Sequence, residues 1–297
     1  MKVLSLFDGI ACGYLALLRA NINITLYYAS EIDKYAIKIA NKHFPDIINL
    51  YDIKNWKNWN IDFKDIDLVI GGSPCQGFSI AGKLLNFNDE RSSLFFYYLD
   101  ILNHIKTLNP NVKFLLENVR MKYNIQNKIS ELLDVQPILI NSSLVSAQNR
   151  ERLYWFNWES DIPINKNITI IDILDENNQY ELKNLNYFFN NNPNNIRSNN
   201  LIIDGIANIN GFDIIKRCYN IYGKCPTLTT MQGGHRQPKI VINNQWRKLS
   251  PLECERLQTL PDYYTEGISN SQRYKCIGNG WTVDLIAHLF KNLKENN

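Results

Sequence analysis

The sequence predicts an α/β protein with a mostly parallel sheet, together with a smaller and more β-rich domain. Two observations support this prediction. The first half of the chain alternates short apolar runs with amphipathic helical periods, which is typical of a parallel sheet covered by helices on both faces. Beyond residue 160, an asparagine-rich stretch at 177–210 is followed by short β-like segments that glycines interrupt.

The first half contains the regular alternation. We expect strands at 2–7, 25–30, 67–70, 113–116 and 153–156, and helices at 13–20, 33–43 and 92–107. The last helix carries apolar residues at three- and four-residue spacing, namely Leu94, Phe95, Tyr98, Leu99 and Leu102. Because parallel sheets bind ligands at the carboxyl ends of their strands, functional residues are expected there.

The second half predicts short strands at 218–222, 227–231 and 240–242, and helices at 256–260 and 283–293. The final helix is expected to return to the first domain. A chain of 297 residues is long enough for one large core and a smaller attached domain.

Composition excludes some classes of protein. The chain is 45% hydrophobic and 21% charged, which is ordinary for a soluble globular protein. Its net charge of +3 is compatible with a polyanionic partner but too small to argue for one. No apolar stretch is long enough to span a bilayer, and Asp8 interrupts the apolar start before it resembles a signal peptide. We therefore expect a cytoplasmic protein.

The six cysteines contain no C-x-x-C pair, so neither a disulfide framework nor a structural zinc site is expected. Cys218, Cys225 and His235 could be imagined around zinc, but a fourth ligand at a suitable spacing is missing. Ordinary thiols are the favoured interpretation.

Two loops at predicted strand ends suggest a nucleoside cofactor. The segment FDGIACG at 7–13 follows the first strand and opens a helix, where glycines let the backbone approach a ligand and free N–H groups can bind it. Glu31 ends the second strand, where an acid commonly holds a ribose diol, and Asp52 could accept from an adenine amino group. These features leave open NAD, S-adenosylmethionine, or a glycine-rich turn with ordinary helix-capping acids.

The segment GGSPCQGFS at 71–79 places a thiol in a tight loop directly after a buried strand. Structural cysteines usually lie inside helices or strands, whereas Cys75 lies at a strand-to-loop junction, where thiols become reactive. Glu117 ends another strand at the same expected edge of the sheet. Gln148, Arg150 and Arg152 share one face of an extended segment, and the two arginines could orient a carboxylate, steady a thiolate or hold a phosphate.

Taken together, these motifs resemble those of the C5-cytosine DNA methyltransferase family of prokaryotes and phages, almost from end to end. They occur in the family's order: FDGIACG (7–13), Glu31 in SEID, Asp52 in YDI, GGSPCQGFS (71–79), DERSSLF (89–95), FLLENV (114–119), QNRER (148–152), PTLTT (226–230), KLSPLECERLQTLPD (248–262) and IGNGWTV (277–283).

The resemblance implies a Rossmann-like S-adenosylmethionine-dependent methyltransferase domain with a small β-rich target recognition domain. It implies that the catalytic residues are Cys75, Glu117, Arg150 and Arg152. It implies a cofactor site formed by Phe7, Asp8, Gly9, Gly13, Glu31, Ile32, Asp52, Ile53, Pro74, Leu94, Asn279 and Val283. The DNA-binding residues it implies are Gln76, Ser79, Lys216, Arg217, Gly233, Gly234, His235 and Arg236, and Lys239 could also contact phosphate or a base edge.

By the same resemblance, residues 1–175 and 270–297 form the catalytic and cofactor-binding domain, 176–247 the target recognition domain, and 248–269 a hinge segment. Two departures from the family pattern stand out: Tyr51 occupies a position where glycine is usual, and Gly280-Trp281 replaces small and β-branched residues. The expected partner is double-stranded DNA, with no membrane and no metal. We expect a monomer, with a cognate restriction endonuclease as a candidate partner in the same system.

Two alternatives remain at this stage. A tRNA cytosine-5 methyltransferase of the same fold would share the catalytic motifs, but its Cys-Phe-Thr signature is not found in the middle region. A non-catalytic DNA-binding regulator descended from the enzyme would be expected to lose the thiol, the acid or the cofactor loop, and all three are present here.

Overall fold

The computed structural model describes residues 1–74, 93–176, 180–189, 196–197 and 201–293. The chain divides into two compact units, which are described separately. The first comprises Met1–Ile140, Glu151–Ile162 and the segment from Ile286 onward, and the second comprises Asn141–Arg150 and Pro163–Leu285.

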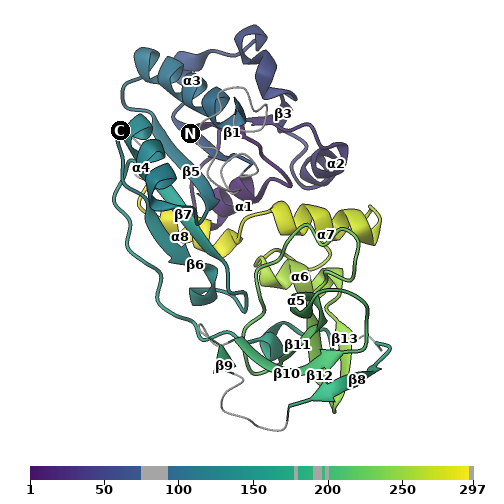
Figure 1. The fold of residues 1–297 in the computed structure, drawn as a ribbon. Helices are drawn as coiled ribbons and strands as arrows, with labels where there is room; N and C mark the ends of the chain where they lie inside the picture. The colour runs from purple at the N-terminus through teal and green to yellow at the C-terminus, as the bar shows by residue number, and fades with distance from the viewer. Residues whose placement is uncertain (75–92, 177–179, 190–195, 198–200, 294–297) are drawn as a thin grey trace. The chain divides into compact units, whose positions relative to one another are not determined.

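The first unit contains a seven-stranded sheet (Figure 1). Its strands follow the order β3-β2-β1-β4-β5-β7-β6. The first five in this order pair in parallel, whereas β7 runs antiparallel to β5. The bounds are β1 Lys2–Leu6, β2 Leu26–Ser30, β3 Ile48–Asn49, β4 Leu68–Gly72, β5 Lys113–Val119, β6 Ile138–Asn141 and β7 Glu151–Phe156. The predicted mostly parallel sheet is confirmed.

Helices pack on this sheet because alternate strand residues are apolar on each face. One face joins side chains of β1, β4, β5 and β7 with helices α3 (Ser93–Leu108) and α4 (Tyr123–Leu133) in a single buried cluster. Within it, Trp155 is fully buried and donates to the Ser130 hydroxyl over 3.0 Å. The remaining helices that belong to this unit or enter it are α1 Cys12–Arg19, α2 Lys34–His43, η1 Ile53–Asn58, η2 Phe63–Asp65 and α8 Val283–Phe290.

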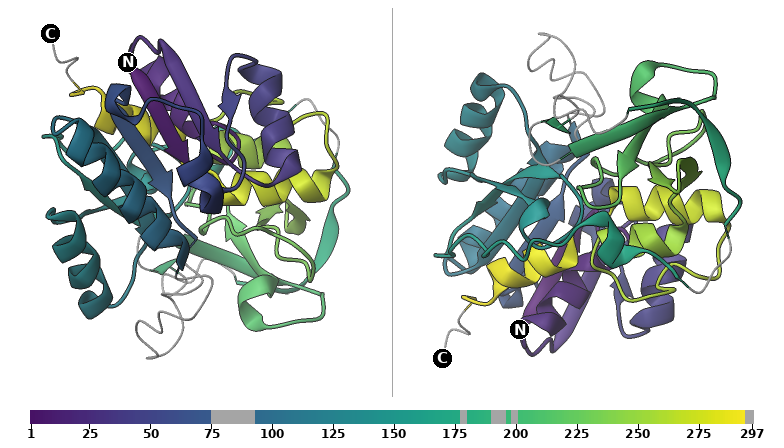
Figure 2. Two further views of the ribbon diagram at one scale, coloured as in Figure 1. Left: turned by 90° about the horizontal axis from the view of Figure 1, so that it is seen from above. Right: turned by 90° about the horizontal axis from the view of Figure 1, so that it is seen from below.

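The second unit is built around a ring of strands that is closed by strand pairing. Figure 2 shows its green strands in two further views. The order β11-β12-β13-β8-β10 is closed by a further pairing between β10 and β11, and β9 is attached to β10. The bounds are β8 Lys183–Phe188, β9 Ile196–Arg197, β10 Leu201–Ala207, β11 Arg217–Asn220, β12 Lys239–Ile242 and β13 Gln245–Lys248. Helices α5 (Asp213–Lys216), α6 (Pro251–Leu257) and α7 (Asn270–Asn279) and the short helices η4 (Ser142–Leu144) and η5 (Ile170–Ile173) complete the unit.

Two apolar clusters stabilise this unit. The smaller takes side chains from all five ring strands, which places it inside the ring; it includes Ala207, Cys218, Val241, Trp246, Leu185 and Phe188. The larger joins the outer face of the ring to α6 and α7 and to the segments before the ring. Ile170 and Ile173 belong to this larger cluster together with Leu249 and Leu257. Residues 163–175, expected in the first domain, therefore pack in the second unit.

Two sequence predictions differ from the structure in this half, and one stretch for which no strand was predicted contains strands. No strand forms at 227–231 in the described chain; this segment runs so close to α7 that a Cβ on Gly278 would lie 1.8 Å from the Thr229 carbonyl oxygen. The helix expected at 256–260 begins earlier, at Pro251, because Ser250 and Glu253 form a capping box there. The asparagine-rich stretch contains β8 and β10.

Candidate active site and recognition loops

The loop after β1 has an unusual backbone. Phe7, Gly9 and Ala11 all have left-handed φ values, of 60°, 62° and 59°. A Cβ placed on Gly9 would meet no atom within 4 Å, so the loop surface is open at this position. A sharply turned loop with open space beside its glycine suits the close approach of a ligand.

Glu31 braces this loop from the end of β2. Its Oε2 accepts from the Gly9 N–H over 2.9 Å, while Oε1 accepts from the N–H groups of Ile32 and Asp33, each over 2.8 Å. A carboxylate oxygen has two lone pairs, so the single bond at Oε2 leaves capacity for one further donor such as a hydroxyl. The position therefore fits the predicted contact with a ribose.

Asp8 belongs to the same loop and contacts β2. Its carboxylate accepts from the Tyr27 hydroxyl over 2.7 Å, and its backbone N–H donates to Ser30. Burial raises the pKa of Asp8 to about 6, although bonds from Ser5 and Tyr27 oppose the shift. Asp8 thus ties the loop to β2 through two hydrogen bonds.

The third strand-end acid, Asp52, caps the short helix η1 by accepting from the Lys54 N–H over 3.0 Å. Tyr51 before it has φ 59°, and its carbonyl accepts from the Ser30 hydroxyl over 2.7 Å. This left-handed backbone explains why glycine would suit position 51. The tyrosine side chain itself is exposed.

The other residues predicted to bind the cofactor occupy varied environments. In the first unit, Ile32 is exposed, Ile53 is buried, Gly13 is buried in α1, Pro74 is exposed after β4, and Leu94 is half-buried in α3. Asn279 ends α7 and is exposed, and Val283 begins α8 and is buried, both within the second unit.

The start of the cysteine loop is fixed to the sheet. Asn118 on β5 donates through Nδ2 to the carbonyl and the hydroxyl of Ser73, over 3.2 and 3.1 Å. Gly71 is required by close packing, because a Cβ there would lie 2.8 Å from the Leu6 carbonyl and 3.1 Å from the Tyr98 ring. Cys75, Gln76 and Ser79 lie outside the described residues. Sequence reasoning missed the role of Asn118, although it follows Glu117 directly.

Glu117 lies next to this point of attachment. It pairs with Gly72 in the register of β4 and β5, and its side chain is 10% exposed. Arg152, on the neighbouring strand β7, places Nε 2.9 Å from Glu117 Oε1. Of the three roles left open for the arginines, this contact corresponds to orienting a carboxylate: Arg152 pairs with Glu117 at the carboxyl end of β5.

Arg150 points elsewhere. It is 4% exposed and donates to the carbonyl groups of Leu228, Gly278 and Gly280, over 3.1, 3.4 and 3.1 Å. Gln148 is also buried: Nε2 donates to Gln258 Oε1 over 3.0 Å, and Oε1 accepts from the Leu228 N–H. Both side chains therefore tie together backbone segments of the second unit.

Lys216 and Arg217, which the resemblance predicts to bind DNA, lie in a segment called loop 212–219 here. It follows β10 and contains α5 and the first residues of β11. Arg217 donates through Nε to Asp213 over 2.9 Å, and Nη2 contacts the same carboxylate oxygen. Its side chain is only 18% exposed, whereas Phe212 beside it is highly exposed. Lys216 is half-buried at the end of α5. A phosphate would therefore have to share Arg217 with Asp213.

The second loop, residues 232–237, is called the glycine loop here. Gly233, Gly234, His235 and Arg236 are all exposed. Lys239 departs from the expectation of direct DNA contact: it is 1% exposed, and its ammonium group donates to the carbonyls of His235 and Gln237 over 2.6 and 3.0 Å. In the sequence, nothing distinguishes this buried lysine from a surface lysine.

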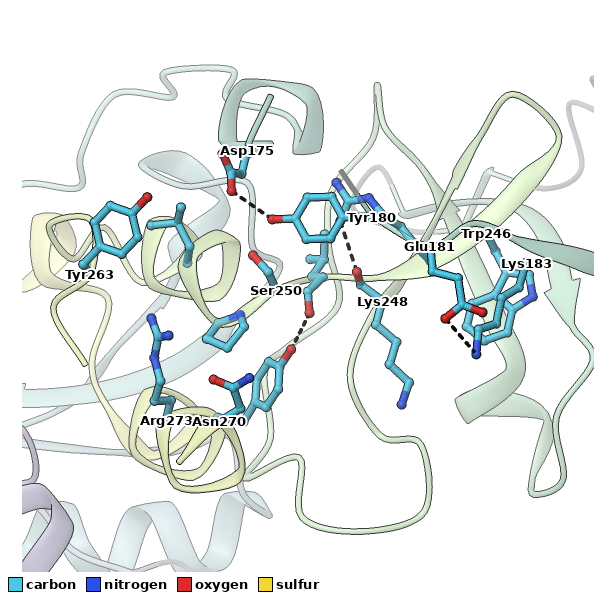
Figure 3. A pocket seen from close by; sticks show the side chains of 15 residues that line it. Asp175, Tyr180, Glu181, Lys183, Trp246, Lys248, Ser250, Tyr263, Asn270 and Arg273 are labelled. Carbon is cyan, nitrogen blue, oxygen red and sulfur yellow. Dashed lines mark hydrogen bonds and ion pairs between the residues drawn. The ribbon is translucent and has the colours of Figure 1, made fainter. Parts of the chain in front are cut away.

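A cavity of about 500 Å³ lies in the second unit near β13 and the starts of α6 and α7 (Figure 3). Its polar groups are largely engaged with one another. The Tyr180 hydroxyl donates to Asp175 over 2.9 Å, and the Tyr274 hydroxyl donates to the Leu249 carbonyl over 2.7 Å. The lining includes none of the site residues predicted from the sequence, and we assign it no ligand.

Within the described ranges, no helix is long and apolar enough to cross a membrane, and no cluster of three or more His, Cys, Asp or Glu side chains could hold a metal ion. The cysteines that the structure describes are buried and form no disulfide with one another: Cys12, Cys218, Cys225, Cys254 and Cys276.

Comparison with known proteins places these motifs in context. The model of the family described as C-5 cytosine-specific DNA methylase matches residues 1–295. The orphan methyltransferase M.SPBetaI of Bacillus phage SPbeta is 28% identical, over 99% of this chain and 97% of that protein. The type II methyltransferase M.HhaI of Haemophilus parahaemolyticus is 26% identical, over 99% of this chain and 94% of that protein.

Solved structures share the fold. The Entamoeba histolytica methyltransferase EhMeth superposes with a TM-score of 0.71 at 19% identity, covering 99% of both chains. The Dnmt2 methyltransferase of S. pombe gives 0.66 at 17% identity, covering 98% of this chain and 97% of the other. With its motifs in family order and a family model matched over almost its whole length, this chain belongs to the C-5 cytosine-specific DNA methylase family and is a DNA cytosine-5 methyltransferase.

Proposed function

We propose that this enzyme transfers a methyl group from S-adenosylmethionine to C5 of a flipped-out cytosine in a short, specific duplex DNA sequence, through a covalent bond between Cys75 and C6 of the base. The observation that carries the proposal is the Glu117–Arg152 ion pair, at 2.9 Å. It lies beside Gly72 and Ser73, from which the chain leads to Cys75. The family supplies the reaction class, and this geometry supplies a carboxylate, held by an arginine, next to the strand that precedes the cysteine loop.

The chemistry requires these residue types. C5 of cytosine is a weak nucleophile, but addition of the Cys75 thiolate to C6 makes C5 enamine-like. A proton on the ring N3, held in a hydrogen bond that the Glu117 carboxylate accepts, takes up the electrons that are pushed into the ring. When bound, S-adenosylmethionine supplies the electrophilic methyl group. Loss of the C5 proton then lets the Sγ–C6 bond break by β-elimination, which regenerates the thiolate.

The described residues fit the proposed cofactor. Oε2 of Glu31 can accept a hydroxyl hydrogen, because among the described residues it accepts one bond, from the Gly9 N–H. The open surface at Gly9 leaves room for a ligand against the backbone. Phe7, with its left-handed backbone in the same loop, is the candidate for stacking on the adenine. We propose the other predicted cofactor residues of the first unit as further contacts in this site.

We further propose that loop 212–219 and the glycine loop recognise DNA. The exposed positions of the glycine loop include Arg236, whose guanidinium can form a bidentate pair with guanine, and His235. Lys216 and Arg217 are the candidates for phosphate contacts in the other loop. The target atom is hidden inside a duplex, so the cytosine must leave the base stack to reach Cys75.

Substitution of Cys75 and Glu117 tests the proposed chemistry. Cys75→Ser should lower methylation of duplex DNA at least about a thousandfold, because a serine hydroxyl cannot replace the thiolate as a nucleophile. Cys254→Ala, which changes a fully buried thiol of α6, is the matched control and should retain activity. Glu117→Gln should reduce the rate while cofactor binding is unchanged.

A duplex containing 5-fluorocytosine should trap the wild-type protein as an adduct that survives denaturing gels, because fluorine cannot leave C5 as a proton does. An adduct formed by Cys75→Ser would contradict the assignment of the nucleophile. The same labelled cofactor should be offered with duplex DNA and with total tRNA. Methylation of tRNA alone would move the proposed substrate to RNA, and no transfer to either would favour the non-catalytic alternative.

A further inference from the structure

The glycine loop has a backbone that requires outside support. Met231, Gly233, Gly234 and His235 all lie in the left-handed region, with φ values of 51°, 69°, 56° and 58°. Two of these residues carry side chains, for which this region is unfavourable. Residues 232–236 are exposed, so packing of their own side chains cannot hold the turn.

Lys239 provides that support from inside the ring. In the strand register it pairs with Cys218 of β11 and Lys248 of β13, and it alternates with Val241, so its side chain starts on the inner face of the ring. From there its ammonium group reaches the carbonyl oxygens of His235 and Gln237, over 2.6 and 3.0 Å. A buried ammonium group is costly unless it is hydrogen-bonded, so the loop and the lysine stabilise each other.

Lys239 also pairs in the strand register with a residue in the second half of the other recognition loop. Cys218, its neighbour on β11, donates through its thiol to the carbonyl of Lys216 over 3.5 Å. Burial, with a contribution from Lys248, lowers the pKa of Lys239 to about 8, which leaves the group mainly charged at pH 7. Lys239 thus bonds to one of the two loops that the proposed function assigns to DNA and pairs along the strand with a residue of the other.

We propose that Lys239 is the positioning residue for DNA recognition: it holds the glycine loop in its binding conformation without contacting DNA itself. The proposal rests on the proposed role of that loop. It predicts that substitution of a residue buried away from DNA changes which sequences are methylated.

The test compares Lys239→Met with a matched buried lysine. Lys224 is 4% exposed and donates to the carbonyls of Ser143, Ser146 and Ile168 in the same unit, away from the glycine loop. Both variants lose hydrogen bonds from a buried ammonium group to backbone carbonyls. Each is assayed for thermal stability, cofactor binding and methylation of a randomised duplex library, and Lys239→Arg tests rescue.

Lys239→Met should lower kcat/KM at the cognate sequence at least about tenfold, because hydrogen bonds from a charged group to the loop are lost. Its library profile should become less specific, and trypsin should cleave the native variant faster after Arg236. Lys224→Met should lose stability yet keep the wild-type profile, and Lys239→Arg should restore most of the specificity. Cofactor affinity should be unchanged in all three.

An unchanged library profile in Lys239→Met would overturn the proposal. So would equal loss of specificity in Lys224→Met, which would show a general effect of destabilisation. A Lys239→Met protein that is unfolded while Lys224→Met is folded would also count against it, because Lys239 would then serve the core. Failure of the wild-type protein to methylate any duplex would instead contradict the proposed function.

Discussion

Replacing Gly9 and Gly234 one at a time with alanine applies the same perturbation to the proposed cofactor loop and the proposed DNA loop. The two glycines have φ values of 62° and 56°, and a Cβ on either would meet no atom within 4 Å. Steric overlap is therefore absent in both cases, and only the left-handed backbone opposes the methyl group. That conformation costs an alanine about 1–2 kcal/mol.

This free energy must appear in one of two measurements. If the loop keeps its shape, the unfolding free energy falls by about 1–2 kcal/mol. If the free loop relaxes, the same strain returns on binding and the Kd of its ligand rises about 5- to 30-fold. Calorimetry with S-adenosylmethionine, fluorescence anisotropy with cognate duplex at fixed salt, and thermal unfolding separate these outcomes.

The two variants should have opposite profiles. Gly9→Ala should weaken cofactor binding or stability while the binary affinity for DNA is retained, and Gly234→Ala should weaken DNA binding while cofactor affinity is retained. Weakened cofactor binding in Gly234→Ala, or weakened DNA binding in Gly9→Ala, would refute the assignment of the loops. Unchanged stability and affinity in both would refute the estimate of backbone strain.

Two further predictions concern stability. Arg247→Met leaves the buried Glu253 carboxylate without its bidentate partner, at 2.7 and 2.8 Å, and should lower the free energy of unfolding in denaturant by about 3–5 kcal/mol. Lys166→Met, in the exposed pair with Asp284, should lower it by about 1 kcal/mol or less. Equal losses in the two variants would contradict this prediction. Because the pKa of Asp8 is raised from 3.8 to about 6, its protonated form stabilises the fold below pH 4, and that contribution is lost as the pH rises through 6. The unfolding free energy of Asp8→Asn relative to wild type should therefore rise by about 2–3 kcal/mol between pH 4 and 7, and a flat difference would show that Asp8 is well solvated.

Much of the first unit could be predicted from sequence because its strands are buried on both faces and its helices have clear apolar periods. Glu117 was expected at the edge of the sheet where β4 ends, because parallel strands have their carboxyl ends at one edge, and it pairs there with Gly72. Alternation along the segment before the aromatic strand grouped Arg152 with Arg150 on one face but left its partner open, and the structure identifies Glu117 as that partner.

Alternation could not predict which partner a long side chain reaches. Arg150 shares its pattern with Arg152, but three backbone carbonyls from distant parts of the chain bind it. Those carbonyls have no signature in the sequence. Lys239 presents the same difficulty. Its burial depends on closure of the ring by the pairing of β10 with β11, and the sequences of these two strands do not predict that they pair. The segment 227–231 has β-like composition, yet its N–H and carbonyl groups bond to side chains instead of a strand.

The closed ring of β8 and β10–β13 has an implication for protein engineering. Both recognition loops lie at connections between strands that are neighbours in the ring. Residues 208–216 join β10 to β11, and residues 221–238, which include the glycine loop, join β11 to β12. A closed sheet presents no unpaired edge to other chains. The strands that border these connections are therefore held by hydrogen bonds to their neighbours in the ring, which do not depend on the sequence of the connection. Because closure entropy grows slowly with loop length, segments of other lengths can be grafted between the same strand ends at small cost. A graft of the second loop should keep a lysine at position 239, so that the ring supplies the ammonium group to whichever carbonyls the new loop presents.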